Sequence, residues 1–175
     1  KKDLLKLANE NAVKLLNERL RKGSLSLKND LQAAEELQQA LGLEHPLERM
    51  DCFDISHTQG SETVASMVVF RNGTSSKKDY RRYKIVSAEG KPDDFKSMQE
   101  GVYRRYRDYE DLPSLVVIDG GKGQLSSALE VIRGLGLDDL PVVGLAKREE
   151  EIFKPHQSES IMLDREGAAL HLIQR

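Results

Sequence analysis

The sequence predicts a mixed α/β fold in which three antiparallel strands are followed by parallel strands that alternate with helices. One observation is the aliphatic run 115–118, which leads into an acid and a glycine-rich turn and is typical of a buried parallel strand. A second is the apolar run 141–145, which follows a helical segment. A third is the pair of strand-like segments 50–56 and 63–70, the latter followed by the hairpin signal Asn72-Gly73.

The first part of the chain is expected to be helical. Apolar residues recur with helical spacing over residues 1–22 and again over residues 29–41. Gly23 and Gly42 follow these stretches, and glycine is the commonest residue just after a helix. We therefore expect two helices joined by a loop at 24–28.

A domain boundary is expected at Pro46, where the periodicity changes from helical to strand-like. It divides the chain into an N-terminal helical segment, residues 1–47, and a sheet domain, residues 48–175. The sequence begins inside a helical pattern and ends on Arg175 without a terminating signal. We expect a fragment of a longer protein, with its second domain truncated at the C-terminus.

The remaining elements follow in an order that defines a topology. They are a strand at 78–86, helices at 92–109 and 125–133, a short hairpin at 152–153 and 160–163, and a last helix at 165–175. The order of the elements is that of the ribonuclease H-like fold: three antiparallel strands, a helix, a strand, a helix, a strand and a final helix. Such a fold hosts many activities, so the function must be argued from the site.

The composition is that of a globular chain without a strong overall charge. Of 175 residues, 38% are hydrophobic and 32% charged, and the net charge is −2. No apolar run approaches the ~20 residues of a membrane span. The single cysteine, Cys52, excludes an internal disulfide and indicates a reducing, cytoplasmic location. Any binding of nucleic acid must depend on local basic clusters.

Two aspartates are the candidate catalytic and metal-binding residues. Asp54 lies in the first predicted strand and Asp119 ends the fourth, and these strands are neighbours in the predicted topology. Two adjacent carboxylates repel each other unless a cation lies between them, and Mg²⁺ or Mn²⁺ prefers oxygen ligands. The pair predicts metal-assisted hydrolysis of a nucleic-acid backbone. The alternative for Asp119 is a turn or helix-capping role.

Basic residues near the two acids are candidates for contacts with DNA phosphates. They lie on the third strand or follow the fourth and fifth strands, and tyrosines lie close to several of them: Arg81, Arg82, Lys122, Lys147 and Arg148. The alternative is a solvated face with the tyrosines half in the core.

Two further residues are candidates for an accessory role. His57 follows Asp54 by three residues and could be a metal ligand or a partner of one, although a turn histidine is the alternative. Asp94 is expected to be an acid of a helix start, and a position close to the metal is the alternative.

Four motifs resemble the C-terminal half of UvrC, the incision subunit of bacterial nucleotide excision repair. They occur in the same order as in that family and are FDISHTQG (53–60), YRRY (80–83), VIDGGKGQ (117–124) and GLAKR (144–148). The resemblance extends from about Arg49 to the end of the chain.

The resemblance implies an endonuclease that cuts damaged double-stranded DNA on the 5′ side of a lesion, with UvrA and UvrB as partners of the whole protein. It implies a divalent metal at an Asp-Asp-His triad like that of Argonaute nucleases, in which Asp54 and Asp119 match the two aspartates. His171 falls earlier than the histidine of the family. We therefore expect this chain to lack the third ligand and the helix-hairpin-helix domain, and to be weakly active or inactive alone.

Two alternatives stay open. One is a non-catalytic module of the same fold that binds nucleic acid or a protein. The other is an enzyme acting on a sugar phosphate or nucleotide through the glycine turn. The segment Gly120-Gly121-Lys122-Gly123 lacks the GxxxxGK[ST] pattern of a phosphate-binding loop, which argues against the second alternative.

Overall fold

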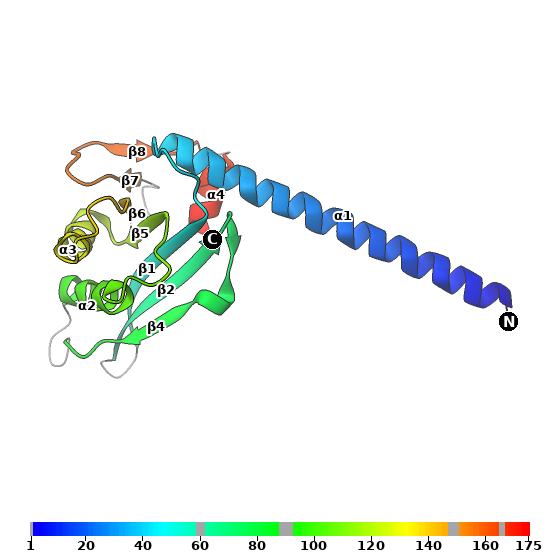
Figure 1. The fold of residues 1–175 in the computed structure, drawn as a ribbon, viewed down its shortest axis with the longest axis horizontal. Coiled ribbons are helices and arrows are strands. Elements are labelled where there is room, and N and C mark those ends of the chain that lie inside the picture. Colours follow the sequence, from blue (N-terminus) through cyan, green and yellow to red (C-terminus); the bar gives the residue numbers. More distant parts are fainter. Residues whose placement is uncertain (1, 59–61, 88–92, 147–150, 165–166) are drawn as a thin grey trace.

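The computed structural model describes residues 2–58, 62–87, 93–146, 151–164 and 167–175 (Figure 1). Their helices are α1 (Lys2–Ala40), the short 3₁₀ helix η1 (Lys77–Asp79), α2 (Asp94–Tyr106), α3 (Gly121–Gly134) and α4 (Ala168–Gln174). Their strands are β1 (Arg49–His57), β2 (Thr63–Arg71), β3 (Thr74–Ser75), β4 (Arg81–Lys84), β5 (Leu115–Asp119), β6 (Val142–Ala146), β7 (Glu151–Phe153) and β8 (Ser160–Met162).

All the described strands belong to one mixed sheet with β1 near its centre. The strand order is β3-β2-β1-β5-β6-β7-β8, and β4 also pairs with β2. β1 is antiparallel to β2 but parallel to β5, and β5 is parallel to β6. β7 and β8 continue the sheet as an antiparallel hairpin. This arrangement confirms the predicted mixed sheet.

The two faces of the sheet are covered by different helices. On one face, Phe53 of β1 packs in a cluster with Val102 of α2 and with residues of α3. On the other face, Met50 of β1 packs with Leu37 of α1 and Leu170 of α4. Side chains alternate along a strand, so odd-numbered residues of β1 face α2 and α3, and even-numbered residues face α1 and α4.

The N-terminal region forms one helix, α1, so the prediction of two helices was wrong (Figure 1). Gly23 does not end a helix, and the loop expected at 24–28 is helical. Glycine inside a helix costs only about 1 kcal/mol relative to alanine. No proline lies between Lys2 and Ala40 to remove a backbone donor, so the helix continues past this weak point.

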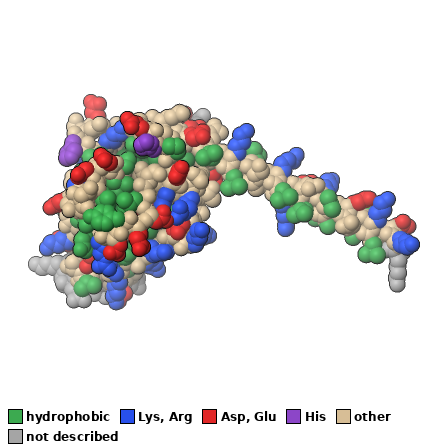
Figure 2. Space-filling view, in the orientation of Figure 1, with side chains coloured by type: hydrophobic (Ala, Val, Ile, Leu, Met, Phe, Trp, Pro, Cys, Tyr) green, Lys and Arg blue, Asp and Glu red, His purple; other side chains and the backbone are tan. Residues whose placement is uncertain are grey.

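Only the C-terminal turns of α1 pack on the sheet. Ala33, Ala34 and Leu37 are buried, whereas the upstream leucines such as Leu16 and Leu20 are exposed on a helix that projects from the sheet (Figures 1 and 2). Leu37 shares a cluster with the sheet, so the last turns of α1 belong to its core. The division into residues 1–47 and 48–175 stays a prediction.

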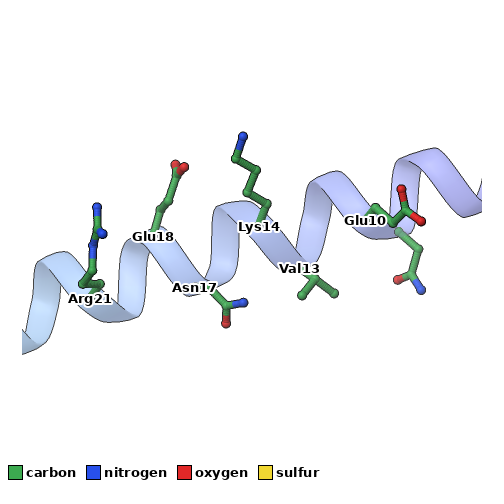
Figure 3. A pocket seen from close by; sticks show the side chains of 7 residues that line it. Glu10, Val13, Lys14, Asn17, Glu18 and Arg21 are labelled. Carbon is green, nitrogen blue, oxygen red and sulfur yellow. The ribbon is translucent and has the colours of Figure 1, made fainter.

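The projecting part of α1 carries a row of charges that alternate in sign. Glu10, Lys14, Glu18 and Arg21 follow one another at spacings of four and three residues (Figure 3). Opposite charges at these spacings favour an isolated helix. The shallow depression between them is lined by α1 alone. None of the helices in the described ranges is both long and apolar enough to cross a membrane.

The third predicted strand is shorter than the expected range 78–86, because a local turn precedes it. Arg71 Nε donates to Asp79 Oδ2 at 2.8 Å, and Ser76 Oγ donates to the same oxygen at 2.6 Å. These hydrogen bonds lower the pKa of Asp79 and stabilise η1, so strand pairing begins only at Arg81. The described part of the last helix likewise begins at Ala168 rather than at residue 165.

A buried ionic network holds α2 against β1. Asp51 is fully buried, and its Oδ1 accepts a hydrogen bond from Arg49 Nε at 2.8 Å. Its Oδ2 accepts one from the Tyr106 hydroxyl at 2.8 Å and lies 3.3 Å from the guanidinium of Arg105. Burial, together with the Asp51 carboxylate, raises the pKa of Tyr106 well above its ordinary value, so the phenol stays a neutral donor.

We expect Gly73→Ala to destabilise the protein by about 1–3 kcal/mol, because Gly73 has φ +81°. A Cβ there would also lie 1.9 Å from the backbone oxygen of Asp30, where the hairpin packs on α1. Gly134→Ala is the matched control, since nothing lies within 4 Å of its added Cβ. Urea unfolding measures both variants. Equal stability of the two would contradict the packing of this hairpin against α1.

We expect Tyr106→Phe to lower the free energy of unfolding by about 1.5–3 kcal/mol at pH 7, because a buried carboxylate loses a donor. The pKa of Tyr106 is raised in the folded state, so its contribution is complete below its ordinary pKa of 10.0 and is lost at higher pH. The gap between wild type and variant should therefore narrow above about pH 10. Chemical denaturation from pH 7 to 11 tests this, with the exposed Tyr103→Phe as control. A gap that is constant with pH would overturn it.

Candidate active site

Asp54 and Asp119 lie on the two central strands at neighbouring positions. In the parallel pairing of β1 with β5, Phe53 lies opposite Ile118, and the next residue on each strand is one of the two aspartates. Neighbouring strands are about 4.8 Å apart. The structure thus brings together the two acids that the sequence analysis selected, although they lie 65 positions apart in the chain.

Both aspartates lie on the face of the sheet toward α4. Cys52, two residues before Asp54, packs against the cluster of α1 and α4, and Val117, two residues before Asp119, belongs to it. A cavity of about 210 Å³ lies at this place and is lined by both aspartates, by Ser66 of β2 and by the end of α4. Asp54 is exposed and Asp119 is half-buried, so the site is reached from solvent.

The glycine-rich turn after β5 places the start of α3 directly over the end of the strand. α3 begins at Gly121, four residues earlier than the predicted range 125–133. Gly120 has φ +151°, and a Cβ there would lie 2.4 Å from the side chain of Gln124. Glycine is therefore required at position 120 because the side chain of Gln124 packs against it.

Gln124 is a residue of this turn that the sequence analysis did not select. Its side chain is buried, and its Oε1 has no hydrogen-bond partner within the described part of the chain. A buried amide oxygen without a donor is costly and usually has a reason. The sequence signal for Gln124 was its place in the motif 117–124, but nothing local indicated that it would be buried.

The chemistry of the donors at the two aspartates fits a hard divalent cation. Two carboxylates on adjacent strands, with the hydroxyl of Ser66 on the next strand, offer only oxygen atoms, which Mg²⁺ and Mn²⁺ prefer. The described residues contain no group of three or more His, Cys, Asp or Glu side chains that could hold a metal. Asp54 and Asp119 remain the predicted ligands of such an ion.

His57 and Asp94 are brought together, but on the opposite face of β1. The odd-numbered face, to which His57 belongs, packs on α2 and α3. His57 Nε2 lies 2.7 Å from Asp94 Oδ1, and its Nδ1 lies 3.1 Å from Thr63 Oγ1. Asp94 is the first residue of α2, so the pair ties the end of β1 to the start of that helix.

The candidate basic residues are distributed over several positions. Lys122 lies in the first turn of α3, where its Nζ donates to Ser158 O at 3.1 Å and lies 5.1 Å from the ring centroid of Phe153. Arg81 and Arg82 lie on β4 and are exposed. Lys147 and Arg148 lie outside the described residues.

A mixed sheet with helices on both faces, whose central strands β1 and β5 carry aspartates at neighbouring positions, defines a ribonuclease H-like domain. The chain belongs to the family of the UvrC RNase H endonuclease domain, whose family model matches residues 38–175. This confirms the resemblance predicted from the four motifs, and with it the ribonuclease H-like fold.

Relatives of known sequence agree with this family. UvrABC system protein C of Salinibacter ruber is 53% identical over 145 residues, which cover 79% of this chain and 23% of the relative. UvrABC system protein C of Dehalococcoides mccartyi is 44% identical over 183 residues, which cover 99% of this chain and 30% of the relative. The chain therefore spans less than a third of the length of these relatives.

Among solved structures, the catalytic domain of human Endonuclease V is 25% identical, and the match covers 58% of this chain and 45% of that one. The TM-score of this match is 0.39.

Proposed function

We propose that this chain hydrolyses a phosphodiester bond of DNA on the 5′ side of a lesion, with a divalent metal ion held by Asp54 and Asp119. The observation that carries the proposal is the adjacency of these two aspartates on one face of the sheet, in a chain of the UvrC RNase H endonuclease domain family. The cavity beside them has a volume of about 210 Å³, and Asp54 in its lining is exposed to solvent.

The protein's own part in this chemistry is to bind and to orient. The carboxylates of Asp54 and Asp119 would hold Mg²⁺ or Mn²⁺ at the centre of a rigid sheet, which fixes the ion relative to the DNA backbone. When bound, such an ion polarises the phosphodiester and lowers the pKa of water that attacks it. We place the scissile phosphate over the cavity lined by these two residues and Ser66.

The proposed substrate is damaged double-stranded DNA in the bacterial cytoplasm, and the proposed partner is UvrB, with UvrA acting earlier. Support comes from the relatives, which are named as protein C of the UvrABC system. Because the chain spans only 23–30% of those relatives, the partners are proposed for the whole protein.

The other selected residues keep supporting roles in the proposal. Cationic residues would contact DNA phosphates, and these are Arg81, Arg82, Lys122, Lys147 and Arg148. His57, which is paired with Asp94, would have an accessory role by fixing the end of the strand that carries Asp54.

We expect Asp54→Asn or Asp119→Asn to reduce 5′ incision at least about 100-fold, because each substitution removes a charged ligand of the ion. The assay is incision of a lesion-bearing duplex loaded with UvrB, by full-length protein in Mg²⁺ or Mn²⁺. DNA binding and the 3′ cut should persist. Asp138→Asn, an exposed acid beyond the end of α3, is the matched control.

Retained 5′ incision in both variants would mean that the two aspartates are structural. The alternative of a non-catalytic module that binds nucleic acid or a protein would then replace the nuclease proposal. Thermal unfolding of each variant shows that a loss of activity is not a loss of folding.

We expect the 175-residue chain alone to nick the same duplex at most weakly, even in Mn²⁺. In this proposal the chain supplies two carboxylate ligands, Asp54 and Asp119, and two ligands hold an ion less tightly than three. Gel analysis of nicking, with full-length protein as reference, measures this. Efficient nicking by the chain alone would mean that two carboxylates are enough to hold the ion.

A further inference from the structure

Four residues form one row across the sheet at the level of the candidate active site. Asp54 of β1 lies opposite Ser66 of β2, and Ser66 lies opposite Arg82 of β4. Asp119 of β5 occupies the neighbouring position on the other side of Asp54. Residues directly opposite one another on neighbouring strands share a face. Arg82, Ser66, Asp54 and Asp119 therefore form a continuous row on the face toward α4, which we call the catalytic row.

The two consecutive arginines of β4 face opposite sides of the sheet. Tyr83 packs with the residues beneath α2, so Arg81 shares that side, whereas Arg82 shares the side of Asp54. Arg81 is occupied structurally, because its Nη1 donates to the backbone oxygens of Lys78 at 3.1 Å and Tyr80 at 2.9 Å.

Arg82 has no such structural use. Within the described ranges its side chain makes no hydrogen bond and no ion pair, and it is exposed. Lys84, two residues further along the same strand, lies on the same face and pairs with Glu62 at 2.8 Å. Arg82 is thus a cation presented to solvent at the edge of the row that carries the two acids.

We propose that the strand being cut lies along the catalytic row, and that Arg82 binds a backbone phosphate one or two nucleotides from the scissile bond. The inference rests on the proposed function of Asp54 and Asp119. Arg82 is two strands from Asp54, about 10 Å at 4.8 Å per strand. Successive phosphates of one DNA strand lie further apart than their ~3.4 Å rise along the helix axis, because the backbone winds around that axis. The distance therefore corresponds to one or two nucleotides.

The chemistry of the row indicates a phosphate rather than a base. A guanidinium offers several donors in a planar fork that matches phosphate oxygens. Ser66, between Arg82 and Asp54, adds a small hydroxyl donor that lines the cavity. The row carries no aromatic side chain on which a base could stack. Contacts of this kind position a strand without reading its sequence, as required for cutting beside lesions in any sequence.

The test uses full-length protein, UvrB and a lesion-bearing duplex in which single methylphosphonates replace successive phosphates near the 5′ incision site. Wild type should lose about tenfold in incision rate when the neutral group lies one or two nucleotides from the cut. Arg82→Ala should lose about as much on unmodified DNA and show no further loss at that position. Lys96→Ala, which removes an exposed cation of α2 on the other face of the sheet, is the control and should keep the sensitivity of wild type.

A second measurement separates this inference from the proposed nuclease function. The slope of log affinity against log salt concentration should fall in magnitude by about 1 in Arg82→Ala and stay unchanged in Lys96→Ala, whether or not the DNA is cut. The proposal is wrong if Arg82→Ala keeps both the position-specific loss of incision on methylphosphonate DNA and the salt slope of wild type. If Asp54→Asn retains incision while Arg82→Ala changes the slope, the nuclease proposal fails and the binding row stands.

Discussion

The parallel pairing of β1 with β5 is the constraint on which the candidate site depends. Its register sets Asp54 beside Asp119, and a slip of one residue would turn one of them to the opposite face. Burial fixes this register from both sides, because Val116 packs in the cluster under α2 and α3 and Val117 in the cluster under α1 and α4. The position of the acidic pair is therefore a consequence of how the core is packed.

The two faces of β1 have different roles, and a single strand connects them. On the face toward α2, Asp51 is buried in a network with Arg49, Arg105 and Tyr106, which holds the helix in place. Three residues further along the strand, Asp54 lies on the other face beside the open cavity. A buried carboxylate must be satisfied by donors, whereas an accessible one can hold an ion. The two aspartates therefore differ in role because their environments differ, although the residue type is the same.

Much of the fold could be predicted because strand and helix patterns are local. The runs at 115–118 and 141–145 are apolar throughout, which predicts buried strands. The order of the elements then predicted that Asp54 and Asp119 would lie on neighbouring strands. Features set by distant contacts could not be predicted. Nothing in the sequence near Asp51 shows its partners on α2. The helix α1 continues through Gly23 because a glycine lowers helix stability only slightly, so a single glycine is weak evidence for a helix end.

The same limit applies to the basic residues. Alternation along β4 shows that Arg81 and Arg82 point to opposite sides, but only the pairing with β2 shows which of them shares the face of Asp54. A chain with a net charge of −2 does not attract DNA through its overall field, so a few well-placed cations must act. A few phosphate contacts give weak binding. On this argument the contribution of Arg82 is to set where the strand lies over the acidic pair, and affinity must come from the other parts of the repair assembly.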